Sequence, residues 1–348
     1  EYGAGVTSLF QLVFIFACFG NLIMTFTTVF KYIKFIEIGN AALISFIVIA
    51  GTILYSIRGG LKTSLRTGAI QTVMNIGIMI ALIYLGMQTI PDKAVTDFLN
   101  GRKQITDLFD YNLLITFGIT AFLSFITGPA MSATHHQKSF AQQNKTPWKA
   151  WAIGAPGYLI VQTLAAFVGI IALAQGMEVA NLSTMQFEYA KGLGTLGLAL
   201  IGVMLLNIAC VVIDAHGNGI ASIVSNDFVK NEKNSVLVSK ITLAVAGFLA
   251  WVVALAEFDL TYIFFTYGIL RTNLFIILVA LLAGWIAYTR RGIFWAGAIM
   301  CPATVTLGIY AMNTKQPLLN VTASVLAMFA TPAIAYALSK LLPADEKS

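Results

Sequence analysis

The stretch YSIRGGLKTSLRTGAIQ, from Tyr55 to Gln71, carries a glycine pair among three basic residues. It lies between two apolar stretches, and each of these is long enough to cross a bilayer as a helix. Short basic connections between apolar segments are typical of the cytoplasmic side of multi-pass membrane proteins. The stretch therefore predicts a turn between two membrane-spanning helices.

The composition of the whole chain excludes an ordinary soluble domain. Of 348 residues, 58% are hydrophobic and 10% are charged, and the mean hydropathy is +0.83. The apolar runs are continuous, which favours helices over barrel strands, whose residues would alternate. The predicted fold is an all-α polytopic membrane domain over residues 1–348. Its ten expected spans are 6–30, 40–57, 67–87, 113–127, 151–174, 196–225, 236–256, 260–287, 293–312 and 318–342.

Several classes of protein find no support in the sequence. The three cysteines fall inside predicted spans without disulfide or metal spacing, so we expect neither a metal site nor a cofactor. No HExxH, GxSxG or pair of aspartates in facing spans points to an enzyme. The net charge of +6 needs no nucleic-acid partner, because basic loops face the anionic lipids of the inner leaflet.

The orientation follows from the loops, because short cytoplasmic loops carry the excess of Lys and Arg. With the first residue inside, thirteen basic residues fall on the cytoplasmic side and seven on the other. We therefore expect both ends of this chain to be cytoplasmic. The short loops favour a bacterial inner membrane.

The fourth span is expected to be broken. It runs into Thr127-Gly128-Pro129 and then into SATHHQKSFA, so the helix should stop near Gly128 and resume as a polar half-helix. Broken helices near the midplane are where secondary transporters place their binding sites. The alternative is that Pro129 merely ends the span at the membrane surface.

Two motifs resemble those of the sodium:solute symporter family. In the opening stretch the matching residues are Tyr55, Gly59, Gly60, Leu61, Thr67, Ile70 and Gln71. In VVIDAHGNGIASIVSNDFVK, residues 211–230, they are Asp214, Asn218, Ser222 and Asp227. QKSFA, residues 137–141, is a weaker match to the step after the family's broken sixth core helix.

The resemblance implies a transporter of two inverted five-helix repeats, in which this chain supplies core helices three to ten, about 6–287, and two trailing helices, about 293–342. Family members usually have thirteen helices and an extracellular N-terminus. Three helices would then precede this chain, which agrees with a cytoplasmic first residue. We expect either a fragment, a naturally short chain, or a separate chain that supplies the three helices.

The residues expected at the family's sodium sites are degenerate. Gly68 stands where the family usually has aspartate, and Val211 and Val212 replace a pair of hydroxyl residues. Sodium needs several oxygen ligands, and these side chains offer none. Backbone carbonyls and water remain as ligands, so sodium and a proton are both candidate coupling ions.

The other polar residues inside the spans are candidates for the substrate or ion pathway. Asp214 either carries a coupling proton or is a structural hydrogen-bonding residue, and Asn218 follows one turn later. Asn21 aligns with a polar, sugar-contacting position of sugar-transporting relatives, or else bonds a neighbouring helix. Gln71 lies on a polar stripe that faces a cavity or another helix.

Arg271 is the least expected residue, because a guanidinium stays charged inside the membrane. It pairs with Asp214, binds an anionic substrate, or snorkels to an interface.

The sequence thus predicts a secondary active transporter of a small organic solute that works by alternating access. The alternative is a symporter-like sensor or structural subunit that does not transport.

Overall fold

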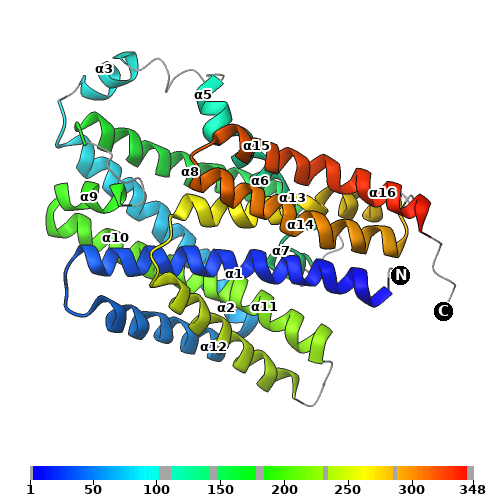
Figure 1. Ribbon diagram of the computed structural model, residues 1–348. Coiled ribbons are helices and arrows are strands. Elements are labelled where there is room, and N and C mark those ends of the chain that lie inside the picture. Colours follow the sequence, from blue (N-terminus) through cyan, green and yellow to red (C-terminus); the bar gives the residue numbers. More distant parts are fainter. Residues whose placement is uncertain are drawn as a thin grey trace.

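Long helices that run side by side make up the computed structural model (Figure 1). It describes residues 3–91, 93–101, 111–140, 147–177, 184–229, 234–284 and 288–342. Within these ranges the chain forms helices and no strand, as expected for an all-α membrane protein. In chain order the elements are α1 (Gly3–Phe35), α2 (Ala41–Met87), α3 (Ala94–Gly101), α5 (Tyr111–Leu113), η1 (Leu114–Gly118), α6 (Ile119–Thr127), α7 (Ala133–Phe140), α8 (Pro147–Ala174), α9 (Met185–Gly192), α10 (Gly194–Val212), η2 (Ile213–Gly217), α11 (Asn218–Ile223), η3 (Val224–Val229), α12 (Ser235–Ala254), α13 (Leu260–Leu282), α14 (Arg290–Asn313), α15 (Pro317–Val325), η4 (Leu326–Ala330) and α16 (Thr331–Leu341).

Nine helical segments in the described part of the chain are long and apolar enough to cross a membrane. They correspond to nine of the ten predicted spans. The tenth, expected at 113–127, is helical from Tyr111 to Thr127 but shorter than the others. The predicted span 260–287 also ends earlier, at Leu282.

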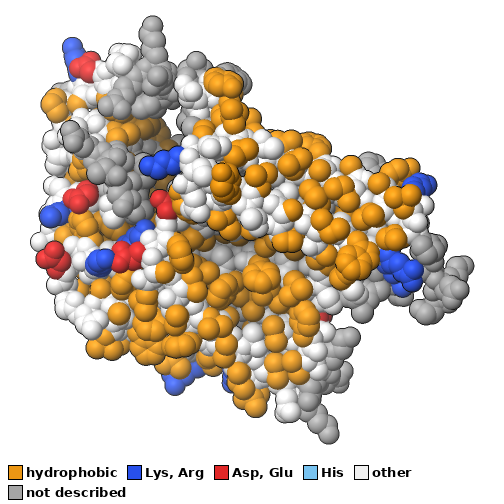
Figure 2. Space-filling view, viewed as in Figure 1, with side chains coloured by type: hydrophobic (Ala, Val, Ile, Leu, Met, Phe, Trp, Pro, Cys, Tyr) orange, Lys and Arg blue, Asp and Glu red, His pale blue; other side chains and the backbone are white. Residues whose placement is uncertain are grey.

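The surface fits a bundle that stands across a bilayer. Hydrophobic side chains cover much of the face in Figure 2, and charged side chains gather toward its ends. α1 begins and α16 ends at the same end of the bundle (Figure 1), where Val6, Ile293 and Ala335 share one apolar cluster. We call this end of the bundle the Gly3 end. The opposite end, where α1 finishes, is called the Phe35 end. The start of α1 and the end of α16 therefore lie on one side of the bundle, and that this side is cytoplasmic stays a prediction.

The chain changes direction at the predicted glycine turn, but the turn itself is helical. Residues 59–66 are helical, so α2 runs without interruption over 47 residues. The Tyr55 hydroxyl nevertheless lies 2.6 Å from Thr67 Oγ1, a residue 12 positions later. In a straight helix these two residues would be roughly 18 Å apart along the axis. The helix therefore bends back on itself, and its halves run in different directions (Figure 1).

α1 lies at the centre and packs on several sides. Its first part joins α13 and α14 through Val6 and Phe10, its middle joins α11 and α12 through Cys18 and Leu22, and its last part joins α10 through Tyr32. Hydrophobic side chains along the whole of α1 are buried, which explains why this helix has an apolar sequence almost all round.

Candidate functional site

The broken helix predicted at Gly128 is present. α6 ends at Thr127, residues 128–132 form turns, and the polar helix α7 begins at Ala133. The break lies deep in the bundle, because Ser124 and Gly128 contact Arg271, the twelfth of 23 residues in α13. The alternative, that Pro129 ends the span at the membrane surface, is therefore wrong.

A cavity of about 490 Å³ lies beside the break. It opens at the Gly3 end, where the exposed side chains of Thr7, Asp227 and Leu282 line it. Its inner wall includes Phe14 and α7, whose His136 packs against the Phe14 ring at 5.7 Å between centroids. The broken helix thus forms part of the wall of a cavity that leads from one end of the bundle toward its middle.

Most of the polar residues of this cavity were not singled out by the sequence. Two matched residues of the second motif, Ser222 and Asp227, do line it. The structure adds Gln11, Asn226 and His136. A signal that could have found them is the spacing of four residues, which places Thr7 with Gln11 and Ser222 with Asn226 on one face of a helix.

His136 also ties α7 to the turn before it. Its Nε2 donates a hydrogen bond to the Ala130 carbonyl at 2.7 Å. Two residues earlier, the Thr134 hydroxyl donates to the Ala215 carbonyl of η2 at 3.0 Å. The short helix α7 is therefore held both to the break and to the centre of the span that runs from Gly194 to Val229.

Asp214 lies in η2, a π-helical segment inside that long span. π-Helical turns within α-helices are frequent at functional sites, because they rotate side chains out of the regular register. The Asp214 carboxyl is 4% exposed and accepts a hydrogen bond from Ser56 Oγ at 2.5 Å, and Tyr55 also interacts with it. Both contacts come from the first half of α2, beside the bend.

The remaining pathway candidates do not gather at one site. Asn218 Nδ2 donates to the Asp214 carbonyl oxygen at 2.8 Å, so these two belong to one helix turn. Asn21 donates to the Ala17 carbonyl at 2.9 Å, within its own helix. The half-buried Gln71 has an Oε1 that is buried without a hydrogen-bond partner among the described residues. Their roles in a pathway remain predictions.

Arg271 is 8% exposed in the middle of α13. Its Nη2 donates to the Ser124 carbonyl at 3.1 Å, and its Cζ lies 4.7 Å from the centre of the Tyr267 ring. The idea that it snorkels to an interface is wrong, because the residue is buried at mid-helix. Pairing with Asp214 and binding of an anionic substrate stay predictions.

The three residues at expected sodium positions offer no side-chain oxygen. Gly68 has open space beside it, since an added Cβ would meet nothing within 4 Å. Val211 and Val212 are half-buried at the end of α10, and Val212 packs against the apolar cluster around Leu22. Space for a side chain therefore exists at Gly68.

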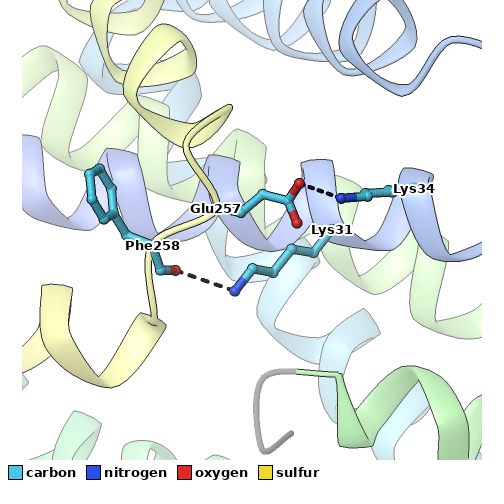
Figure 3. A network of polar contacts seen from close by, with 4 residues as sticks. All are labelled: Lys31, Lys34, Glu257 and Phe258. Atoms are coloured by element: carbon cyan, nitrogen blue, oxygen red, sulfur yellow. Dashed lines mark hydrogen bonds and ion pairs between the residues drawn. The ribbon is translucent and has the colours of Figure 1, made fainter.

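Polar contacts join two elements at the Phe35 end (Figure 3). The cavity opens at the other end, the Gly3 end. Lys34 Nζ lies 2.5 Å from Glu257 Oε1, and Lys31 Nζ donates to the Phe258 carbonyl at 3.3 Å. These contacts connect the last turn of α1 with the segment between α12 and α13. The bundle thus has a cavity that opens at one end and an ionic connection at the other.

This ionic connection should be weak and sensitive to salt. The Lys34 and Glu257 side chains are 58% and 34% exposed, and exposed pairs typically contribute 0.2–1 kcal/mol. We expect Glu257→Gln and Lys34→Gln to lower the melting temperature slightly at low salt and hardly at all at about 1 M salt. A double-mutant cycle by scanning fluorimetry measures the coupling between the two side chains. Coupling that is zero at low salt would contradict the prediction.

No family model matches the sequence, and no curated protein matches it. Among solved structures, the chain is similar to a Na+-coupled sialic acid symporter in its substrate-bound, outward-open state. The TM-score is 0.78 and the sequence identity is 14%, over 99% of this chain and 76% of that one. At this identity the likeness shows the fold alone. The bundle described above therefore has the fold of a sodium-coupled transporter.

Proposed function

We propose that this chain forms most of a secondary active transporter that moves a small organic solute by alternating access. The observation that carries the proposal is the cavity of about 490 Å³ that opens at the Gly3 end and ends at the broken helix. Transporters of inverted-repeat type bind solutes at broken helices near the midplane and expose them to one side at a time. With both chain ends cytoplasmic, this arrangement is open to the inside.

The proposal includes three further helices that precede α1, in the same chain or in another. It is supported by the motifs at Tyr55 and Asp214. It is also supported by the solved neighbour, because this chain covers 76% of that protein and the remaining 24% has no counterpart here. The same motifs support core helices three to ten of the two inverted repeats over about 6–287, and the short loops favour an inner-membrane location.

Coupling to sodium is expected to be weak. The solved neighbour is Na+-coupled, which keeps sodium as a candidate ion. Gly68, Val211 and Val212 nevertheless supply no side-chain oxygen, and a hard cation needs several oxygen ligands. A proton on Asp214 is the other candidate, because this buried carboxyl sits in the π-helical segment η2.

Transport by the full-length gene product in proteoliposomes tests the proposal. The probes are radiolabelled sialic acid, proline and glucose, each with an inward sodium gradient, with an inward proton gradient and with neither. We expect uptake of one probe above protein-free liposomes, with little stimulation by sodium. A Val211→Ser/Val212→Thr variant should raise the sodium stimulation if the missing hydroxyls limit it.

Absence of uptake for every probe, from protein that is folded and monodisperse, would contradict the proposal. Such a result, together with a thermal shift on binding one of the probes, would favour the non-transporting sensor.

A further inference from the structure

The end of α6 has a carbonyl group that is released from the helix. In a regular helix the Gly128 N–H would bond to the Ser124 carbonyl, four residues earlier. Here it bonds to the Phe125 carbonyl at 3.2 Å instead. Pro129 follows directly and has no N–H to offer the next carbonyl. The Ser124 carbonyl thus lacks its usual N–H donor. On α6 it accepts only the Thr127 hydroxyl, at 3.3 Å, and it is able to accept a second donor from another element.

That donor is the guanidinium of Arg271. Its Nη2 bonds to the Ser124 carbonyl at 3.1 Å, and a Cβ built on Gly128 would lie 3.5 Å from Nη1. The C-terminal end of a helix carries a partial negative charge, and a cation placed there is stabilised. Inside a membrane this interaction is screened less than at a surface. Arg271 therefore caps the broken helix from the neighbouring helix α13.

The guanidinium is held in place on its own helix as well. Tyr267, one turn earlier, lies beneath it, with 4.7 Å between Cζ and the ring centre. Gly268 lets α13 approach α6 closely, because a Cβ at this position would collide with the Ser124 side chain. The cation is thus positioned by an aromatic ring and by the close contact of two helices.

We infer that Arg271 is a tethered cation, a positioning residue that takes the place of a bound monovalent cation at the end of α6. Exposed carbonyls and C-terminal helix ends at mid-membrane are the groups that bind coupling cations in transporters. Here the Arg271 side chain permanently neutralises the negative C-terminal end of α6. The consequence is that the break, and with it α7 and the cavity wall, is fixed by a charge that cannot dissociate. This inference rests on the contacts of Arg271 and does not depend on transport.

Cys18 reports on the position of α7. Its thiol is 1% exposed and interacts with Thr134 and with the backbone of Ala133, at the start of α7. The charge of Arg271 also acts on this thiol, and its removal alone would slow alkylation, so that faster labelling reports exposure. Ala133 also lines the cavity. Movement of the break should therefore uncover Cys18 to a reagent that enters from the Gly3 end. Cys301 shares an apolar cluster with Met131 of the break. The half-buried Cys210 in α10, outside that cluster, therefore serves as the internal control.

The experiment compares Arg271→Lys, Arg271→Met and Arg271→Ala in the purified full-length protein. We expect Cys18 to react with N-ethylmaleimide about tenfold faster in Arg271→Met, the factor expected for loss of a charge at a partly buried helix end. Arg271→Lys should stay within about twofold of the unchanged protein, because the charge remains. Cys210 should react equally in all of them, as followed by mass spectrometry.

Chemical rescue separates a cation site from a merely structural role. Arg271→Ala leaves space for a free guanidinium ion, so guanidinium chloride at about 20 mM, far below denaturing concentrations, should raise its melting temperature and slow the labelling of Cys18. Urea at the same concentration has a similar shape and no charge, and should do neither. Lys340→Ala is the control variant, because Lys340 also lies over a tyrosine ring, at 5.4 Å from Tyr336, but at the end of α16.

Equal labelling in Arg271→Met and Arg271→Lys, or rescue by urea as strong as by guanidinium, would overturn the inference. If the Met and Ala variants do not fold, Arg271→Gln replaces them. The glutamine amide is a hydrogen-bond donor without a charge, so this variant removes the cation and keeps a polar side chain at the end of α6. Arg271→Gln should speed the labelling of Cys18, and an unchanged rate would also overturn the inference.

Discussion

Replacement of Gly268 by leucine should prevent α13 from packing against α6 and give the largest loss of stability. A Cβ at Gly268 would collide with Ser124 Oγ and lie 2.8 Å from Ser124 Cβ. Membrane helices associate through such close contacts of small residues, because lipid supplies no hydrophobic force between them. Overpacking of a tight contact typically costs 1–3 kcal/mol, and leucine adds further atoms beyond Cβ. We expect a melting temperature lower by about 5 °C or more.

The matched control is Gly77, an exposed glycine in α2 where an added Cβ would meet nothing within 4 Å. Gly77→Leu and Gly77→Ala should be neutral or slightly stabilising, because both residues favour helix more than glycine does. Gly268→Ala should fall between its leucine variant and the unchanged protein. The measurement is the folded, monodisperse fraction after heating in detergent. Similar losses at Gly268 and Gly77 would show that helix contact is not the cause.

Replacement of Asp214 by leucine should give the second largest effect. The carboxyl is 4% exposed and accepts the Ser56 hydroxyl at 2.5 Å, so leucine would leave a buried donor without its acceptor. A buried group in that state costs roughly 1–3 kcal/mol. Asp214→Leu is therefore expected to lower the melting temperature by several degrees, with Asp214→Asn much closer to the unchanged protein.

The asparagine variant also separates the two roles of Asp214. An amide accepts the Ser56 hydrogen bond but carries no titratable proton. If Asp214 is structural, Asp214→Asn should keep both stability and uptake in proteoliposomes. If it carries the coupling proton, uptake driven by a pH gradient should disappear while stability remains. A large loss of stability in Asp214→Asn would contradict both roles as stated.

The sequence predicted the spans well because a single local property decides them. About 20 apolar residues cross the hydrocarbon core, and such runs are visible without knowledge of the neighbours. The break at Gly128 was predictable for the same reason, since Pro129 removes a donor within its own helix. The bend at residues 59–66 was found as a turn, but its helical character depends on hydrogen bonds that a glycine pair does not reveal.

The site was less predictable because lipid and protein interior are both apolar, so hydropathy does not tell which face of a helix meets which neighbour. Arg271 meets Ser124 across 147 residues, and Lys34 meets Glu257 across 223. No local pattern encodes such distances. The cavity likewise combines residues from α1, α7, α11, η3 and α13, which lie far apart along the chain. Asp214 was found because it belongs to a contiguous motif. Its partner Ser56 was missed, because the two residues meet only in the folded chain.

The hydrogen bond between Tyr55 and Thr67 has a consequence for biosynthesis. It closes a loop of only 12 residues and joins the two halves of α2 before any distant part of the chain is needed. Closing a loop of about ten residues takes on the order of 10–100 ns, far less than the synthesis of one residue. The second and third spans are therefore able to leave the translocon together as a preformed helical hairpin. The stretch from Tyr55 to Gln71 would then act first as a folding unit in the nascent chain.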